Sequence, residues 1–461
     1  MGKTAVLAVF DIGKTNKKLL LLDEEYRIVY EESRQFSEIH DEDGDACEDI
    51  AALGAWIKDR LATVSTRSEF HVVGVNFSAY GASFVHIDCE GEVVTPLYNY
   101  LKPYPLALQR RFYEQYGGEA QVSRQTASPV LGSLNSGMQL YRLKHEQPQT
   151  YRRIRFSLHL PQYLAYVISG QACSDMTSIG CHTQLWDFQR NAYHAWVTAE
   201  GITKTLAPIT PADAVVSLPW NDRRFIVGPG LHDSSAALIP YLLGDPEPFV
   251  LLSTGTWCIS LNPFNTIPLT ARELEADCLC YLNYQGTPVK ASRLFAGYEH
   301  EEQVKRLAHH YGVSVEHYRC INYSADIVRA VTTPEDAFQT LEDIPGEIIF
   351  KYRELHAYPS YAEAYHRLIL DTVRCQTIST RLVMHNSETR RIFVDGGFSK
   401  NSVFMHALAS ALPDVEVYGA SVPQATAIGA ALAIHAQWNP RQLPAGLISL
   451  QHYAVAHDLS L

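Results

Sequence analysis

The sequence predicts an α/β protein built from two similar domains. The chain has 461 residues, of which 46% are hydrophobic, and this length and composition favour two cores over one. Each half also opens with a buried strand, a turn containing Gly and Thr, and a second strand, first within 5–23 and again within 248–262. A change in composition at 226–230 places the boundary there, giving domains 1–228 and 229–461.

The first domain is expected to begin with three strands, a helix and further strands. The helix is expected at 48–64, where Ile50, Leu53, Ile57 and Leu61 recur at helical spacing. The strands are apolar or alternating runs bounded by turn residues, and they are expected at 5–10, 18–23, 26–36, 71–77 and 85–88.

The second domain repeats this order in a looser form. Strands are expected at 248–253, 257–262 and 391–394, and helices at 402–412 and 425–436. The similarity between the halves is one of architecture more than of residue identity.

Composition excludes several classes of protein. The formal net charge is −12, and the sequence has no dense run of Lys and Arg, with adjacent arginines only in isolated pairs, so a nucleic-acid partner is not expected. The nine scattered cysteines do not resemble a disulfide framework and indicate reduced thiols. A signal-peptide pattern and an apolar stretch long enough to span a membrane are both lacking, so we expect a cytoplasmic protein without a membrane partner.

The first candidate site is the segment 11–18, Asp-Ile-Gly-Lys-Thr-Asn-Lys-Lys. Its Gly-Lys-Thr triplet suggests a P-loop, but a P-loop requires another glycine five residues before Gly13, and Ala8 stands there. The alternatives are a hairpin turn that binds phosphate and an ordinary polar turn with solvated lysines. In the first, Asp11 at the strand end is placed to hold hydrated Mg²⁺. Donors and positive charge would come from Gly13, Thr15, Asn16, and Lys14 or Lys18.

Three further segments carry candidate chemistry, each with a structural alternative. Residues 253–257, Ser-Thr-Gly-Thr-Trp, form a second Gly-Thr turn that would contact a polyphosphate or be an ordinary hairpin. Asp233 follows two glycines and precedes a helical run, so it is either a helix N-cap or a base that accepts a proton during phosphoryl transfer. Gly396 and Gly397 separate a strand from a helix, which lets a nucleotide approach the backbone but is also common in α/β loops.

Taken in order, these four motifs resemble those of the FGGY family of carbohydrate kinases over nearly the whole chain. The resemblance implies two actin-like, ribonuclease-H-like domains with a cleft between them, with the sugar and phosphate side in 1–228 and the ATP side in 229–461. It implies Mg²⁺ on Asp11, the transferred phosphate beside Gly13, Thr15, Asn16 and Lys18, and Asp233 as catalytic base. It further implies that Gly255 and Thr256 hold the ATP phosphates and that Gly396, Gly397 and Asn401 face the adenosine.

The resemblance also bears on the sugar. Trp257 after the Gly-Thr turn is similar to the L-fuculose and L-rhamnulose kinases, as is the segment 174–187. Substrate contacts are implied for Tyr80, Gly81, Ser83, Asp175, His182 and Asp233. Ser83 departs from the family, which has an aspartate there, and 174–187 is one residue longer than the family pattern, with His182 inside it.

We therefore expect an ATP-dependent kinase that phosphorylates a hydroxyl of a ketose, an L-ketose such as L-fuculose or L-rhamnulose. Alternatives are a kinase for xylulose, ribulose or a glycerol-like polyol, and a non-catalytic nucleotide-dependent regulator on the same fold. The presence of both Asp11 and Asp233 argues against the regulator. The expected partner is a small sugar, and homodimers are common in the family.

Overall fold

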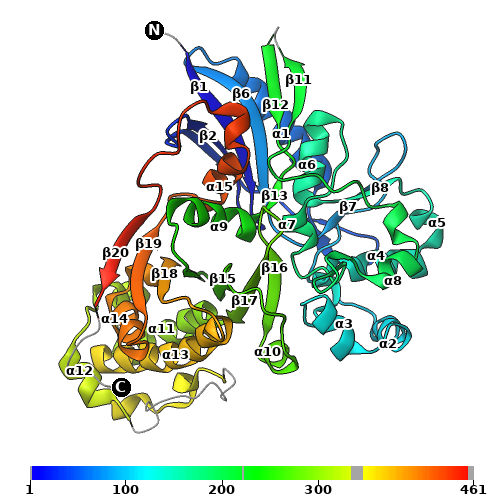
Figure 1. The fold of residues 1–461 in the computed structure, drawn as a ribbon. Helices are drawn as coiled ribbons and strands as arrows, with labels where there is room; N and C mark the ends of the chain where they lie inside the picture. Colours follow the sequence, from blue (N-terminus) through cyan, green and yellow to red (C-terminus); the bar gives the residue numbers. More distant parts are fainter. Residues whose placement is uncertain (1–2, 221–222, 334–345, 455–461) are drawn as a thin grey trace. The chain divides into compact units, whose positions relative to one another are not determined.

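The computed structural model describes residues 3–220, 223–333 and 346–454 (Figure 1). The chain divides into two compact units. Unit 1 comprises Met1–Asp245, Cys280–Pro288 and Pro423–Leu447, and unit 2 comprises Pro246–Leu279, Val289–Val422 and Ile448–Leu461. Residues 229–245, which the sequence placed in the second domain, pack in unit 1 because β13 (Leu231–His232) pairs with β6 (Phe70–Ala79) and α9 (Asp233–Gly244) contacts α15 (Ala425–Ala433).

Unit 1 is built on a seven-stranded sheet in the order β11-β12-β6-β1-β2-β3, with β13 also paired to β6. Its other strands are β1 (Thr4–Ile12), β2 (Lys17–Asp23), β3 (Ile28–Arg34), β11 (Val216–Trp220) and β12 (Arg223–Val227). β1 runs antiparallel to β2 and parallel to β6. The strands expected near the N-terminus are therefore present, and so is the expected helix, α1 (Ile50–Ser65).

Strand β1 is buried on both faces, which explains its continuous apolar run. Val6, Ala8 and Phe10 belong to one hydrophobic cluster with α1 and α6 (Leu160–Ser169). Side chains alternate along a strand, so Asp11 points to the opposite face. Helix α15 contacts β1, and its Thr426 hydroxyl reaches the Asp11 carboxylate on that face.

The rest of unit 1 consists of short elements. The hairpin-like pairs are β4 (Ile39–His40) with β5 (Ala46–Cys47), β7 (Phe84–Ile87) with β8 (Phe156–His159), and β9 (Trp186–Asp187) with β10 (Ala192–Tyr193). The helices are α2 (Leu106–Gln115), α3 (Glu119–Gln125), α4 (Ser136–Glu146), α5 (Pro148–Tyr151), α7 (Met176–Ile179), α8 (Ala195–Ala199) and α16 (His435–Trp438). Phe112, Tyr141 and Trp196 lie at the centre of a second core here.

Unit 2 contains a sheet in the order β16-β17-β15-β14-β18-β19-β20. The strands of this sheet are β14 (Val250–Thr254), β15 (Cys258–Asn262), β16 (Cys278–Leu282), β17 (Pro288–Leu294), β18 (Arg391–Gly396), β19 (Glu416–Ser421) and β20 (Ser449–Tyr453), and β16 begins in unit 2 and continues into the 280–288 segment of unit 1. β14 is antiparallel to β15 and parallel to β18, as β1 is to β2 and β6. β20 lies antiparallel on β19 as β11 does on β12, so the internal repeat predicted from the sequence is confirmed.

The sheet of unit 2 packs against the longest helix, α13 (Tyr361–Met384), whose apolar residues dominate the core of this unit. The remaining helices are α10 (Ala271–Glu275), α11 (Ala296–Tyr311), α12 (Ala325–Val331) and α14 (Ser402–Ala411). The helix expected at 425–436 is interrupted at Ile434, where α15 ends and α16 follows. Among the described helices, none is long and apolar enough to cross a membrane.

Candidate functional site

Asp11 stands at the end of β1, where the chain enters the turn to β2. Its Oδ2 atom accepts a hydrogen bond of 2.8 Å from the Thr426 hydroxyl. Burial raises the pKa of Asp11 to about 6, and the negative charge of Asp233 also raises it. Two carboxylates therefore lie near each other in unit 1, and a site of this kind gains from a bound cation.

The turn after Asp11 is a tight hairpin, closed by a 3.0 Å hydrogen bond from the Gly13 amide to the Asn16 carbonyl. Thr15 and Asn16 are exposed at its tip. Lys18 returns along β2, and its Nζ donates to Gln424 Oε1 at 3.0 Å and lies 3.4 Å from a Glu31 carboxylate oxygen. The structure thus pairs Asp11 with Lys18 at the turn end of β1 and β2, with Thr15 and Asn16 open to solvent and the Gly13 amide bonded within the turn.

The two other lysines of this turn have partners within unit 1. Lys14 forms an exposed ion pair of 2.6 Å with Glu38. Lys17 is buried, and its Nζ lies 2.9 Å from a carboxylate oxygen of Glu48. The Tyr80 hydroxyl donates to the same carboxylate at 3.3 Å. Lys17 therefore has a structural role that the sequence did not indicate, and neither lysine is a free phosphate ligand in this conformation.

Asp233 is the first residue of α9, and the N-cap position belongs to His232. The N-cap alternative for Asp233 is therefore wrong. Its Oδ1 atom accepts hydrogen bonds from the Ser234 amide at 2.6 Å and from the Ser234 hydroxyl at 3.2 Å, whereas Oδ2 accepts none from the described residues. The side chain is 32% exposed, and burial raises its pKa to about 6. One oxygen is held and the other is open, as a proton acceptor requires.

The residues predicted to contact the sugar have different surroundings in the structure. Ser83 is buried, and its hydroxyl donates to the Tyr98 carbonyl at 2.9 Å. Asp175 is also buried and caps α7 by accepting the Thr177 amide at 2.8 Å. Gly81 packs against the side chains of Cys181 and His232, where a Cβ would lie 2.6 Å from Cys181 Sγ. These contacts are structural ones between protein groups.

His182 and Tyr100 complete the surroundings of Asp233. His182 is buried and lies beside Cys181, with 3.3 Å between its Nε2 and the thiol sulfur. The Tyr100 ring is edge-on to Tyr80 at 5.9 Å. Burial raises the pKa of Tyr100, and the charge of Lys14 opposes this increase while that of Asp233 adds to it. Sequence reasoning missed Tyr100, which belongs to no motif.

Unit 2 contains a cavity of about 640 Å³, within the range of nucleotide-sized sites. Gly255, Gly397 and Asn401 line it, as predicted for the nucleotide side. Gly396 adopts a φ of +94° directly before them, and a Cβ there would lie 2.1 Å from the Thr254 carbonyl oxygen. Thr256 is exposed on the same turn as Gly255. Residues that the sequence did not indicate also line the cavity: Gly297, His300, Tyr318, Arg319, Ile321, Asn322, Lys400 and Ser402.

The side chain of Asn401 has a role other than the predicted contact with adenosine. Its Oδ1 atom accepts the amides of Val403 and Phe404 and so caps α14, and its Nδ2 atom donates to the Tyr365 hydroxyl at 2.8 Å. A ligand can therefore contact only the backbone of Asn401 or the exposed part of its side chain. The side chain therefore shapes the cavity by fixing the start of α14.

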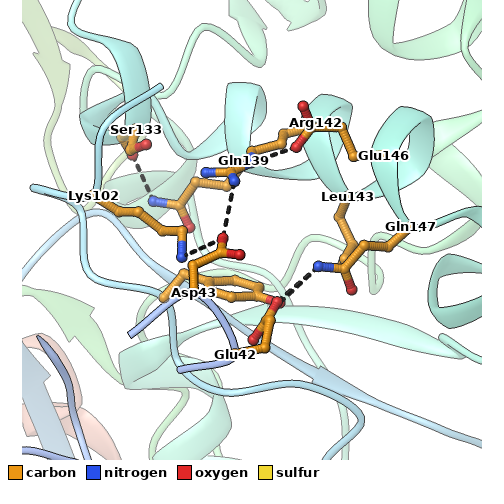
Figure 2. Close-up of a pocket in the computed structure, with 10 residues that line it drawn as sticks. Glu42, Asp43, Lys102, Ser133, Gln139, Arg142, Leu143, Glu146 and Gln147 are labelled. Atoms are coloured by element: carbon orange, nitrogen blue, oxygen red, sulfur yellow. Dashed lines mark hydrogen bonds and ion pairs between the residues drawn. The ribbon is translucent and has the colours of Figure 1, made fainter. Parts of the chain in front are cut away.

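A second pocket lies in unit 1, lined by charged groups (Figure 2). Beside it, Asp41, Asp43 and Asp45 bring carboxylate oxygens within metal-binding range of one another. The Lys102 ammonium lies 2.5, 2.8 and 3.0 Å from oxygens of these three residues. Lys102 already supplies the compensating charge, so this acidic group is a structural ion cluster and carries no evidence of a metal.

Two protein-family models match the chain. The N-terminal domain model of the FGGY family of carbohydrate kinases matches residues 6–218, and the model of the carbohydrate kinase FGGY C-terminal domain matches residues 246–442. The chain therefore belongs to the FGGY family of carbohydrate kinases. The second match begins at the first break between the two units.

Individual relatives are distant. A rhamnulokinase of Mannheimia succiniciproducens is 25% identical over 260 residues, which is 55% of this chain and 52% of that protein. An L-fuculokinase of Salmonella typhi is 22% identical over 404 residues, covering 84% and 76% of the two chains. The chain thus aligns with about half the length of the rhamnulokinase.

Solved structures confirm the predicted two-domain α/β fold. A carbohydrate kinase from Novosphingobium aromaticivorans has a TM-score of 0.77 and 25% identity, covering 98% of this chain and 96% of that one. A ligand-bound xylulose kinase from Lactobacillus acidophilus has a TM-score of 0.77 at 14% identity, covering 98% and 94%. The second match shows a shared fold and leaves the substrate of this chain open.

Proposed function

We propose that this protein transfers the γ-phosphoryl group of ATP to a hydroxyl of a ketose, with Asp233 as the general base. The observation that carries the proposal is the Asp233 carboxylate at the start of α9, with Oδ1 held by Ser234 and Oδ2 open. Membership of the FGGY family supports this reaction class. Unit 1 supplies the base, and unit 2 binds the nucleotide in its 640 Å³ cavity.

Asp233 has the properties that this role needs. Its raised pKa, about 6, makes the carboxylate a better proton acceptor than an ordinary aspartate while it stays ionised at neutral pH. The sugar O–H bond breaks as the oxygen attacks phosphorus, the proton passes to Oδ2, and ADP leaves with the electron pair of the broken P–O bond. Removing such a base costs roughly 10²–10⁴-fold in turnover.

Asp11 fits a magnesium ligand in its donor chemistry. It offers a hard carboxylate oxygen at a strand end, and the neighbouring charge of Asp233 makes its ionised form unfavourable unless a cation is near. The Thr426 hydroxyl holds Oδ2 and leaves Oδ1 to reach a hydrated ion. Mg²⁺ bound here would offset negative charge on the transferred phosphoryl group.

Phosphate contacts are proposed on both units. In unit 1 they come from Gly13, Thr15, Asn16 and Lys18, and in unit 2 from Gly255 and Thr256, whereas Gly396 and Gly397 are proposed to face the adenosine. The exposed side chains of Thr15, Asn16 and Thr256 support this assignment, whereas the amides of Gly13 and Gly255 are bonded within their own turns. The positive charge of Lys18 is offset by the Glu31 carboxylate, and its Nζ donates to Gln424. We therefore expect Lys18 to orient the phosphate more than to attract it.

For the sugar, we propose an L-ketose such as L-fuculose or L-rhamnulose. The rhamnulokinase and L-fuculokinase relatives support this choice, as does Trp257 after the Gly-Thr turn. Ser83 donates its hydroxyl proton to the Tyr98 carbonyl, so it offers a sugar hydroxyl only a neutral acceptor, weaker than the carboxylate of the family aspartate. Tyr100, beside both Tyr80 and Asp233, is the better candidate for a sugar contact in this loop.

The test is ATP consumption with a panel containing L-fuculose, L-rhamnulose, xylulose, ribulose, gluconate and glycerol, with the phosphorylated product identified by mass and ³¹P NMR. Saturable turnover with one L-ketose at least tenfold above the other sugars is expected. Turnover confined to glycerol or gluconate would overturn the ketose assignment. ATP binding without turnover on any member would overturn the kinase assignment and favour a regulator.

A further inference from the structure

A line of hydrogen-bonding groups leads to Asp233 inside unit 1. His182 Nδ1 lies 3.2 Å from the Leu134 carbonyl oxygen. Cys181 Sγ lies 3.3 Å from His182 Nε2 and 3.1 Å from His232 Nε2. His232 Nε2 is in turn 3.2 Å from Asp233 Oδ1. Cys181, His182 and His232 are all buried, so water does not compete for these contacts.

The chemistry of each group fixes the direction of these bonds at the His182 end. A carbonyl oxygen only accepts, so His182 must carry its proton on Nδ1 to bond Leu134. A neutral imidazole then has a lone pair on Nε2, and the Cys181 thiol must donate its proton to that atom. The sulfur is left with lone pairs facing His232.

The same reasoning fixes the tautomer of His232. Burial lowers its pKa to about 3, so the ring is neutral and carries a single N–H. Its Nδ1 atom is buried without a hydrogen-bond partner in the described part of the chain. Nε2 faces both the sulfur of Cys181 and a carboxylate oxygen, and two acceptors call for a donor. The proton therefore belongs on Nε2, because a bare Nδ1 lone pair costs less than a buried N–H without a partner.

The backbone of His232 is held independently. Its amide donates to the Thr177 hydroxyl at 2.9 Å, and that hydroxyl donates to Asp175, the N-cap of α7. On the other side of the ring, Gly81 leaves room that a side chain would remove, since a Cβ would lie 2.9 Å from the His232 ring. Asp175 and Gly81, both predicted as sugar contacts, thus help to position His232.

We propose that His182, Cys181 and His232 form a directional hydrogen-bond chain that orients the carboxylate of Asp233. His232 is the positioning residue in contact with the base, and Cys181 and His182 fix the orientation of its ring. The proposal rests on the proposed function, because only a general base needs one oxygen held and the other presented to a substrate. Ser234 hydrogen-bonds Oδ1, and His232 Nε2 lies 3.2 Å from the same atom, so Oδ2 is the oxygen left to face a substrate.

The hydrogen-bond chain should affect how the reaction rate depends on pH. An N–H that donates to Oδ1 favours the ionised carboxylate, so its loss raises the pKa of Asp233 and moves the acid limb of the rate profile to higher pH. The titratable and charged groups that also face this region are Asp11 and Tyr100 near Asp233, and His159 and Tyr281 near His232. His159 is neutral because burial lowers its pKa to about 3, so it adds no charge at neutral pH.

Spectroscopy of the whole protein tests the chain without turnover. Long-range ¹H–¹⁵N correlations on ¹⁵N-histidine protein, assigned with His182→Gln and His232→Gln, should show His182 protonated on Nδ1 and His232 on Nε2. The infrared S–H stretch of Cys181, isolated as the difference from Cys181→Ser, should be shifted to lower frequency as a hydrogen-bonded thiol. The opposite tautomer at either histidine, or a free S–H stretch, would overturn the proposal.

Enzyme kinetics test the expected effects of the hydrogen-bond chain on kcat and on the acid limb of the rate profile. Cys181→Ser keeps a donor and an acceptor, and its kcat should stay within about twofold of wild type. Cys181→Ala should lose about tenfold in kcat with little change in KM, the effect of one hydrogen bond. His232→Met should also move the acid limb to higher pH, whereas His232→Gln, which retains an N–H, should keep it near wild type. The matched control is Cys173→Ala, a half-buried thiol outside the chain.

The outcomes separate the two proposals. Equal losses in Cys181→Ser and Cys181→Ala would show that packing and not hydrogen bonding matters, and would overturn the chain. Wild-type kcat and acid limb in Cys181→Ala and His232→Met would overturn it as well. Absence of turnover on every sugar would overturn the proposed function alone, since the tautomers and the thiol stretch are measured in the resting protein.

Discussion

Replacing Asp233 by Asn should make the folded protein more stable at neutral pH. Burial raises the pKa of this carboxyl from 3.8 to about 6, which corresponds to about 3 kcal/mol at about 1.4 kcal/mol per unit. Because the side chain is 32% exposed, solvent screening reduces this to about 1–2 kcal/mol. Asn is isosteric and can still accept the Ser234 amide on Oδ1.

The sign follows from the two protonation equilibria. The unfolded chain ionises Asp233 above about pH 4 and the folded chain only above about 6, so the cost of the buried charge is complete above pH 6 and absent below pH 4. The stabilising effect of Asn should therefore be present at pH 7.5 and vanish at pH 4. At the higher pH we expect a rise in Tm of about 3 °C.

Differential scanning calorimetry or urea unfolding at the two pH values measures this effect. Asp414→Asn, on an exposed side chain outside the helices and strands, is the matched control and should change stability at neither pH. A destabilised Asp233→Asn protein at pH 7.5, or an effect equal at both pH values, would refute the claim that Asp233 is an ionised group held in an unfavourable environment.

Three further predictions concern residues around the site. Gly429→Val should destabilise the protein by about 1–3 kcal/mol in urea unfolding, because a Cβ at Gly429 would lie 1.8 Å from the Ala236 carbonyl oxygen; unchanged stability would contradict the contact of α9 with α15. Lys14→Ala should leave kcat and KM within about twofold, because Lys14 is engaged in a surface pair with Glu38; a tenfold rise in KM for ATP would instead assign it to phosphate. Asp11→Asn should raise the half-saturating Mg²⁺ concentration by roughly tenfold or more in a titration of activity, and an unchanged titration would remove Asp11 as the metal ligand.

The fold was largely predictable because its determinants are local. A continuous apolar run such as 5–10 indicates a strand buried on both faces, and the structure places β1 in the middle of its sheet. Strand, Gly-Thr turn and strand recur at 248–262, and that repetition indicated the duplication seen in the two sheets. The placement of residues 229–245 in unit 1 was not predictable from the sequence. It depends on the pairing of β13 with β6, which lies more than a hundred residues earlier in the chain.

The residues of the candidate site were predictable only where a single short segment of the sequence contains the motif. Asp11 and Asp233 stand beside glycines and buried strands, and the structure brings both into unit 1. The contacts around them join distant segments and leave no local signature: Cys181 meets His232, Thr426 meets Asp11, and Lys14 pairs with Glu38. Asn401 illustrates the reverse case, since a polar residue before a helix can serve as a cap as readily as a ligand contact.

The central claim is that Asp233 removes the proton from the acceptor hydroxyl. The most direct measurement is single-turnover transfer from [γ-³²P]ATP to the preferred ketose, comparing wild type with Asp233→Asn from pH 5 to 9. Wild type should show an acid limb near pH 6, and the variant should transfer roughly 10²–10⁴-fold more slowly while binding ATP with unchanged affinity. Transfer by Asp233→Asn within a few-fold of wild type would contradict the account.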